Sequence, residues 1–230
     1  MRRFISIIVV VLLGAALPSV AVAAIPDYQR VIVSRHADAA LTTLDGCVLT
    51  EVFVSGASAV FGGRPGPVNK QGLSSVLVRR SDLCQASASL TTIGVHAAGG
   101  IGGVVLFDGL GQTLAPLAST VHFDQAWMHT AIPLVNEANG DEVVIGLDLT
   151  WDLVGDLERD TGHLHVRVPG EGNVNSHQNT LTGDAVVSGT VTIGSEVLSF
   201  EGVDGAHLQQ VKYGCQVIAF PAAGDPDLSC

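Results

Sequence analysis

The chain has 230 residues, of which 47% are hydrophobic and 5% aromatic, and its formal net charge is −11. Affinity for phosphate backbones needs clustered Lys and Arg, so 11 basic residues against 22 acids argue against a nucleic-acid partner. The hydrophobic fraction argues against intrinsic disorder. The acidic excess predicts repulsion from anionic surfaces and an affinity for divalent cations.

The first 24 residues have the pattern of a secretory signal peptide. Arg2 and Arg3 form the basic start, residues 4–17 are mostly apolar, and residues 21–24 read Ala-Val-Ala-Ala, which suits a signal peptidase. The alternative is an uncleaved anchor, although the apolar run is shorter than the ~20 residues that span a bilayer. Cleavage would remove two arginines and lower the net charge from −11 to −13. We expect a secreted, acidic protein with no transmembrane segment after cleavage.

The four cysteines favour disulfides, because the chain is expected in an oxidising compartment. Proximity in the sequence pairs Cys47 with Cys84 and Cys215 with Cys230. A disulfide from Cys230 to a partner molecule is the alternative for the last residue. A metal site built from cysteines is disfavoured, since no two of them have the C-x-x-C spacing.

Apolar and polar residues alternate with period two along most of the chain, which predicts half-buried β-strands. No segment after the signal keeps helical spacing for three turns, so helical and parallel α/β folds are disfavoured. Strands are expected at residues 31–36, 47–55, 76–80, 88–95, 104–107, 120–134, 143–153, 164–168, 185–193, 197–203 and 206–219.

These strands predict an all-β fold, an antiparallel β-sandwich or jelly-roll-like arrangement stabilised by disulfides. We expect one domain over residues 25–220, followed by a C-terminal tail, 221–230, tied down by Cys230. The alternative is two packed β lobes that divide near residues 99–116, where glycines interrupt the pattern.

Two of the expected strands change the parity of their apolar positions. Phe123 is odd and Met128 is even, so a bulge or corner is expected near residues 124–125. Leu208 is even and Val211 is odd, which predicts a second bulge near residues 209–210.

Three segments of the second half resemble segments of exported, uncharacterised bacterial β-rich proteins. They are LDLTW at 147–151, AVVSGTVT at 185–192 and AHLQQVKYG at 206–214, and the resemblance covers about residues 120–218. That group has no established activity, so the resemblance implies a β-rich fold and export and adds no chemistry.

Asp156, Glu158 and Asp160 stand at alternate positions, a spacing that Ca²⁺-binding loops use to bring several oxygens to one ion. The EF-hand pattern fails further on, at Thr161 and Arg167. The alternative is a solvated strand face that runs into an acidic turn.

His163 and His165 lie two residues apart, which puts both imidazoles on one face of a strand about 7 Å apart. With His177 or Glu171 brought in across a hairpin, they would complete a three-ligand transition-metal site. The alternative is a pair of surface histidines on the polar face opposite Leu164. The other histidines, His36 and His207 among them, are expected to be structural or exposed.

Other catalytic motifs are missing from the sequence. The glycines at 99–103 lack the Lys-Ser/Thr of a phosphate-binding loop, and neither Gly-x-Ser-x-Gly nor His-Glu-x-x-His occurs. Trp151 falls on the apolar face of its strand and is assigned to the core. With so few aromatics left for an exposed platform, a sugar-stacking module is disfavoured.

We therefore expect a secreted, non-enzymatic protein with a binding or surface-structural role, whose partner is a protein or surface ligand and not a nucleic acid. No cofactor is expected apart from Ca²⁺ at the acidic run. The alternative is a secreted protein that binds Ca²⁺ or a transition metal, and a metal-dependent hydrolase is one form of this alternative.

Overall fold

The computed structural model describes residues 28–64, 66–85, 104–169 and 172–219. Several predictions lie outside these residues: the signal peptide at 1–24, the strand at 88–95, the glycines at 99–103 and the tail at 221–230.

The described residues form antiparallel strands and contain no helix, which confirms the all-β antiparallel prediction. Accordingly, no helix in the described ranges has the length and apolarity that a membrane crossing needs. The strands are β1 (Tyr28–Asp45), β2 (Val48–Arg64), β3 (Gly66–Asp82), β4 (Val104–Thr113), β5 (Ala118–Ser119), β6 (Gln125–Val135), β7 (Glu142–Leu153), β8 (Glu158–Val168), β9 (Gly172–Ile193) and β10 (Glu196–Ala219).

All ten strands belong to one sheet, and nine of them follow the order β4-β3-β2-β1-β10-β9-β7-β6-β5. Strand β8 pairs with the first half of β9, and β7 pairs with its second half. A sandwich or jelly-roll topology is not confirmed, because the strands form one open sheet.

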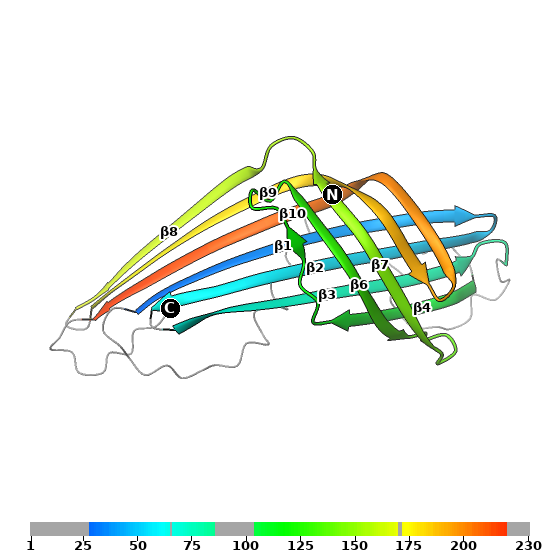
Figure 1. Ribbon diagram of the computed structural model, residues 1–230, viewed down its shortest axis with the longest axis horizontal. Coiled ribbons are helices and arrows are strands. Elements are labelled where there is room, and N and C mark those ends of the chain that lie inside the picture. The colour runs from blue at the N-terminus through cyan, green and yellow to red at the C-terminus, as the bar shows by residue number, and fades with distance from the viewer. Residues whose placement is uncertain (1–27, 65, 86–103, 170–171, 220–230) are drawn as a thin grey trace.

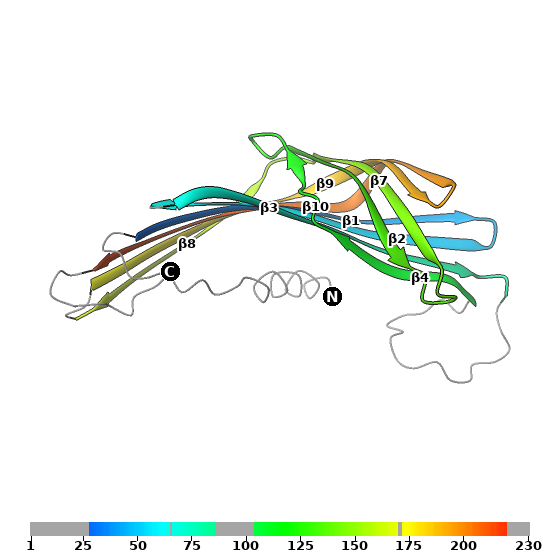
Figure 2. The same ribbon diagram turned by 60° about the horizontal axis from the view of Figure 1, so that its bottom comes forward.

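The sheet divides into two regions. In the folded-over end, residues 37–54, 74–82, 104–153 and 184–208, strands β6 and β7 cross over β1–β4 (Figures 1 and 2). In the open extension, residues 28–36, 57–64, 66–73, 158–168, 172–183 and 209–219, six strands continue as a single layer in the order β3-β2-β1-β10-β9-β8.

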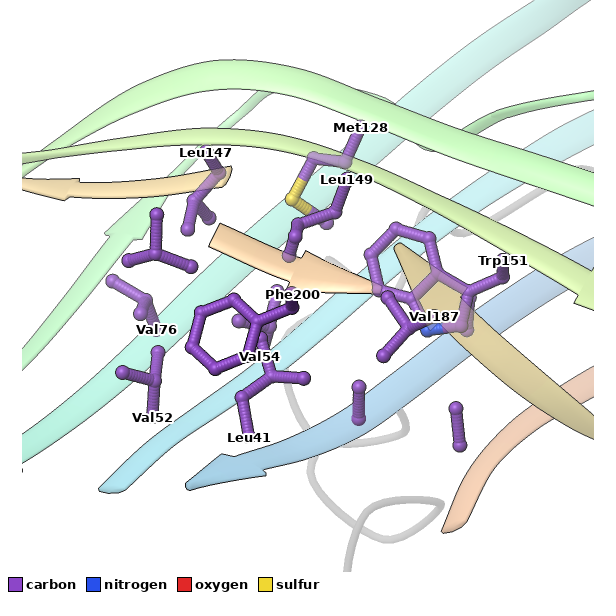
Figure 3. Close-up of a cluster of buried hydrophobic side chains, with 14 of the residues drawn as sticks. Leu41, Val52, Val54, Val76, Met128, Leu147, Leu149, Trp151, Val187 and Phe200 are labelled. Carbon is purple, nitrogen blue, oxygen red and sulfur yellow. The ribbon is translucent and has the colours of Figure 1, made fainter. Parts of the chain in front are cut away.

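The hydrophobic core fills the space between the two layers of the folded-over end (Figure 3). Trp151 is fully buried there, as its strand pattern predicts, and its indole N–H donates a hydrogen bond to the carbonyl oxygen of Asp38 at 3.1 Å. β1–β3 contribute Leu41, Val52, Val54 and Val76, and β6 and β7 contribute Met128, Leu147 and Leu149.

Two glycines allow β4 to approach the backbone of β6 closely. A Cβ atom added at Gly109 would lie 2.8 Å from the carbonyl oxygen of Val135, and one at Gly111 would lie 2.8 Å from that of Pro133. Only a residue without a side chain fits at this separation. The layers are also joined by a hydrogen bond from the N–H of Glu137 to the carbonyl of Asp108, 2.7 Å long.

The two parity changes have different structural causes. The corner expected near 124–125 is confirmed, because the chain turns between β5 and β6 at Phe123, which has a φ of 61°. The bulge expected near 209–210 is wrong, since β10 pairs with β9 without a shift from Ala206 to Ala219. Leu208 is buried on one face of the sheet and Val217 on the other, so the parity change marks where the buried face changes.

The disulfide between Cys47 and Cys84 is confirmed. It links the turn after β1 to the end of β3, with a Cα–Cα distance of 5.4 Å. Cys215 is disulfide-bonded as well, and its predicted partner Cys230 lies outside the described residues. Strand β8 departs from expectation, because Leu164 on its apolar face is 58% exposed. The reason is that β8 is the outer strand of the extension, and no described segment packs over Leu164.

Candidate functional site

One face of the open extension carries cations and no carboxylate among its described residues. Lys70, Arg159, Arg167 and Lys212 lie on this face and are exposed. The carboxylates of β8, Glu158 and Asp160, point to the opposite face, because neighbouring residues of a strand alternate between faces. We call this surface the cationic face.

The strand register fixes the spacing of these charges. Lys212 on β10 and Lys70 on β3 lie in one row across the sheet, with Val33 and Val60 between them. Three strand spacings separate the two lysines by about 14 Å. Arg159 and Arg167 are eight residues apart on β8, which corresponds to about 27 Å. The cations are therefore spread over the face and are not gathered at one point.

Amide side chains fill much of the space between the charges. The register places Asn173, Asn175 and Asn179 of β9 on the cationic face, next to Gln210 and Gln216 of β10. The side-chain oxygens of Asn173 and Asn179 are buried and have no hydrogen-bond partner among the described residues. By the same register, the extension's aromatic residues Tyr28, Phe61 and Tyr213 lie on the opposite face.

Arg35 lies where the cationic face meets the folded-over end, and its guanidinium makes several contacts within the protein. It donates to the side chain of Gln210 at 2.9 Å, to the hydroxyl of Ser119 at 2.8 Å and to the carbonyl of Val121 at 3.1 Å. It also lies over the ring of Phe123, 5.6 Å from the centroid, where a cation–π attraction operates. Arg35 thus joins the two regions and leaves ligand contacts to the other cations.

The three histidines of the expected metal site lie together on the cationic face. His163 is directly opposite His177 in the β8–β9 ladder, and His165 is opposite Asn175. All three imidazoles are exposed. Nδ1 of His165 is hydrogen-bonded to the side-chain oxygen of Asn175. Because that oxygen only accepts, Nδ1 is the donor in this hydrogen bond, and Nε2 is the ring nitrogen that the bond does not use.

The three rings do not converge on one point. The ring of His177 leans over Gly214 of β10, where a Cβ atom would lie 2.6 Å from its Nε2. In the described part of the chain, the one group of three ligand atoms within 4.8 Å of one another comes from Cys47, Asp82 and Cys84. The two cysteines of that group form the disulfide.

The acidic run lies at the start of β8. Asp156 precedes β8, and Glu158 and Asp160 lie within it, all exposed. The strand separates Glu158 and Asp160 by about 7 Å. The ligand atoms of the three residues do not lie within 4.8 Å of one another. The Ca²⁺ site remains a prediction.

Sequence reasoning missed a polar cluster on the face opposite the cationic one. Nε2 of His36 lies 2.9 Å from the hydroxyl of Ser55, and its Nδ1 lies 3.8 Å from the carboxylate of Asp38. The row continues across β10 to β9, where Nδ1 of His207 and the carboxylate of Asp184 are 3.1 Å apart.

Burial controls the protonation of this cluster. It lowers the pKa of His36, although the carboxylate of Asp38 acts in the opposite direction. It raises the pKa of Asp38, against the opposing effects of His36 and His207. His36 is therefore a neutral hydrogen-bonding group at pH 7.

A sequence signal for this cluster exists in the hairpin turn. If Asp45 pairs with Val48 across a tight turn at Gly46, the register places Ser55 opposite Asp38, and the structure has this pairing. The cationic face had a weaker signal. Arg159, His163, His165 and Arg167 share odd numbers, but five strand pairs set the position of this row relative to Lys212 and Lys70.

Two shallow hollows lie on the folded-over end, away from every predicted site residue. One, of about 430 Å³, is flanked by the ion pair of Arg80 and Glu196. The other, of about 390 Å³, lies at Gly146 between His129 and Thr192. Comparison of the chain with protein-family models, with curated proteins and with solved structures found no match.

Proposed function

We propose that this chain is an exported binding protein whose cationic face takes an anionic polysaccharide. The observation that carries the proposal is the separation of charge. In a chain of net charge −11, the exposed Lys and Arg side chains of the extension share one face on which no described carboxylate lies. The net negative charge of the chain repels anions at long range, but an anion close to the cationic face is attracted by the positive side chains there.

The spacing of the cations favours a polymer over a small anion. A small anion needs several donors that converge within hydrogen-bond distance. Here Arg159 and Arg167 stand about 27 Å apart and Lys212 and Lys70 about 14 Å apart. An extended chain with repeated sulfate or carboxylate groups can contact these side chains one after another.

The side chains between the cations favour a polysaccharide among anionic polymers. Asn and Gln amides both donate and accept hydrogen bonds, which suits sugar hydroxyls. Single-stranded nucleic acids bind through aromatic stacking, and membranes through inserted apolar side chains. The extension's aromatic residues lie on the other face, so sugar stacking is not the mode of binding either.

Binding is tested with a sulfated glycan and a polyuronate, each titrated into the protein by calorimetry. We expect saturable binding that weakens as salt is raised, because exposed ion contacts are screened. Lys212→Gln removes one contact of about 1 kcal/mol, which corresponds to about a fivefold loss of affinity. The triple variant Arg159→Glu, Arg167→Glu, Lys212→Glu should abolish binding.

The matched control is Arg30→Glu, which makes an equal change of charge per site on the opposite face of β1. It should leave the affinity within twofold of the unchanged protein. The proposal fails if neither glycan binds, if Arg30→Glu weakens binding at least as much as Lys212→Gln does, or if anionic vesicles or single-stranded DNA bind as tightly as the glycans.

A further inference from the structure

We propose that His163, His165 and His177 form a binding site for a first-row transition-metal ion, with Zn²⁺ as the reference ion. The site lies at the outer margin of the cationic face, on the edge strand β8 and its neighbour β9. Three histidines are a donor set that holds Zn²⁺ with one coordination position left open.

The backbone already places the three side chains at a suitable separation. Directly opposite residues of antiparallel strands have Cβ atoms about 5 Å apart, which is the relation of His163 to His177. His165 lies on the same face two residues along β8, diagonal to His177. Imidazole nitrogens from three such positions can meet at one ion about 2.0–2.1 Å from each nitrogen.

One of the three histidines already has a hydrogen-bond partner of the kind that metal-binding histidines use. The hydrogen bond between Nδ1 of His165 and the side-chain oxygen of Asn175 leaves Nε2 as the free donor atom. In metal-binding histidines, a hydrogen bond at the ring nitrogen that does not bind the metal fixes the tautomer and raises the basicity of the other nitrogen. Asn175 has this position because it is the cross-strand partner of His165.

The movement that binding requires is confined to one side chain. The His177 ring lies over Gly214, so it turns about its own side-chain bonds, away from β10 and toward His163. The β8–β9 ladder keeps its hydrogen bonds during this rotation. Gly214 is the reason that the ring can rest on β10, since any side chain there would occupy the same space.

The surrounding charges identify the class of ion and of its fourth ligand. The site offers imidazole nitrogens and no carboxylate, which suits Zn²⁺, Ni²⁺ or Cu²⁺ and not Ca²⁺. Arg167 and Lys212 lie on the same face and reduce the affinity for any cation. They also favour an anion at the open coordination position. If the proposed function holds, that anion is a sulfate or carboxylate group of the bound glycan.

The test titrates Zn²⁺ into the full chain by calorimetry, with Co²⁺ absorption as a second readout of four-coordinate geometry. We expect one ion per chain, with binding abolished in His163→Gln and in His177→Gln. Asn175→Ala should weaken binding by about 10–100-fold, as the loss of an outer-shell partner does. His129→Gln, which alters an exposed histidine on β6, should bind as the unchanged protein does.

Gly214→Ala separates this site from casual binding to surface histidines. The added Cβ displaces the His177 ring from β10, so the variant should bind Zn²⁺ at least as tightly as the unchanged chain. The proposal is overturned if saturable binding is missing, if it persists in His163→Gln, or if Gly214→Ala abolishes it in a chain that remains folded by circular dichroism. No glycan is present in these titrations, so their failure leaves the proposed function standing.

Discussion

The folded-over end and the open extension are made from the same long strands, yet they use their faces differently. β1, β2, β3, β9 and β10 run through both regions. In the folded-over end, β6 and β7 cover one face and the side chains beneath them are apolar and buried. In the extension no described segment covers the same face, which carries cations, amides and imidazoles. The presence of a second layer therefore decides which region contributes most to the free energy of unfolding and which region is accessible to a ligand.

The largest expected difference between the regions is the effect of removing a large apolar side chain. Trp151→Ala should cost about 3–5 kcal/mol of unfolding free energy, because the side chain is fully buried between the layers. Leu164→Ala on β8 should cost less than about 0.5 kcal/mol, because Leu164 is 58% exposed. Urea denaturation measures both. Equal losses would contradict the division into a packed and an open region.

The Cys47–Cys84 disulfide should contribute the next largest amount. It closes a loop with a sequence separation of 37 residues, and the chain-entropy relation assigns such a loop about 3–4 kcal/mol. The double variant Cys47→Ser, Cys84→Ser should lower the urea midpoint accordingly. The disulfide lies in the folded-over end, so the variant should still bind Zn²⁺ at β8 and β9 at urea concentrations below its unfolding midpoint. If the variant lost Zn²⁺ binding together with stability, the two regions would not be separate.

Two glycine substitutions sharpen the comparison. Gly109→Ala places a Cβ atom against the backbone of β6, which cannot move aside, and should cost about 1–3 kcal/mol. Gly214→Ala meets the ring of His177, which can rotate away, and should cost less than about 0.5 kcal/mol. Thermal unfolding of the two variants compares their losses of stability. A larger loss for Gly214→Ala than for Gly109→Ala would contradict the prediction.

The smallest expected effect is the pH dependence that His36 contributes. Its folded pKa lies below the ordinary value of 6.5, so between the two values the unfolded chain binds a proton that the folded chain does not. Stability should therefore fall as the pH is lowered through that window. The raised pKa of Asp38 acts in the opposite sense, adding stability as the pH falls from its folded pKa toward 3.8. Melting temperatures of the unchanged chain and of His36→Gln, compared from pH 8 to pH 5, should show a shallower decline in the variant.

Local pattern was sufficient for much of the folded-over end. Alternation predicts β7 and the burial of Trp151, and the change of parity after Phe123 predicts the corner before β6. The same reasoning failed at residues 209–210 and at Leu164, because it assumes that one face of a strand is buried along its whole length. The cluster of Ser55, His36 and Asp38 was within reach of the hairpin register, but none of its residues carries a motif.

By itself, the sequence determined the class of fold, the Cys47–Cys84 disulfide and the shared face of His163 and His165, because period-two alternation and short separations act within one strand or hairpin. Only the tertiary structure decided which face is covered, where the cations lie relative to one another, and that His177 stands opposite His163. Those properties depend on the pairing of β1, β8, β9 and β10, whose paired residues are up to 189 positions apart in the chain. Pairing over such distances is fixed by the whole sheet, and no local pattern in the sequence records it.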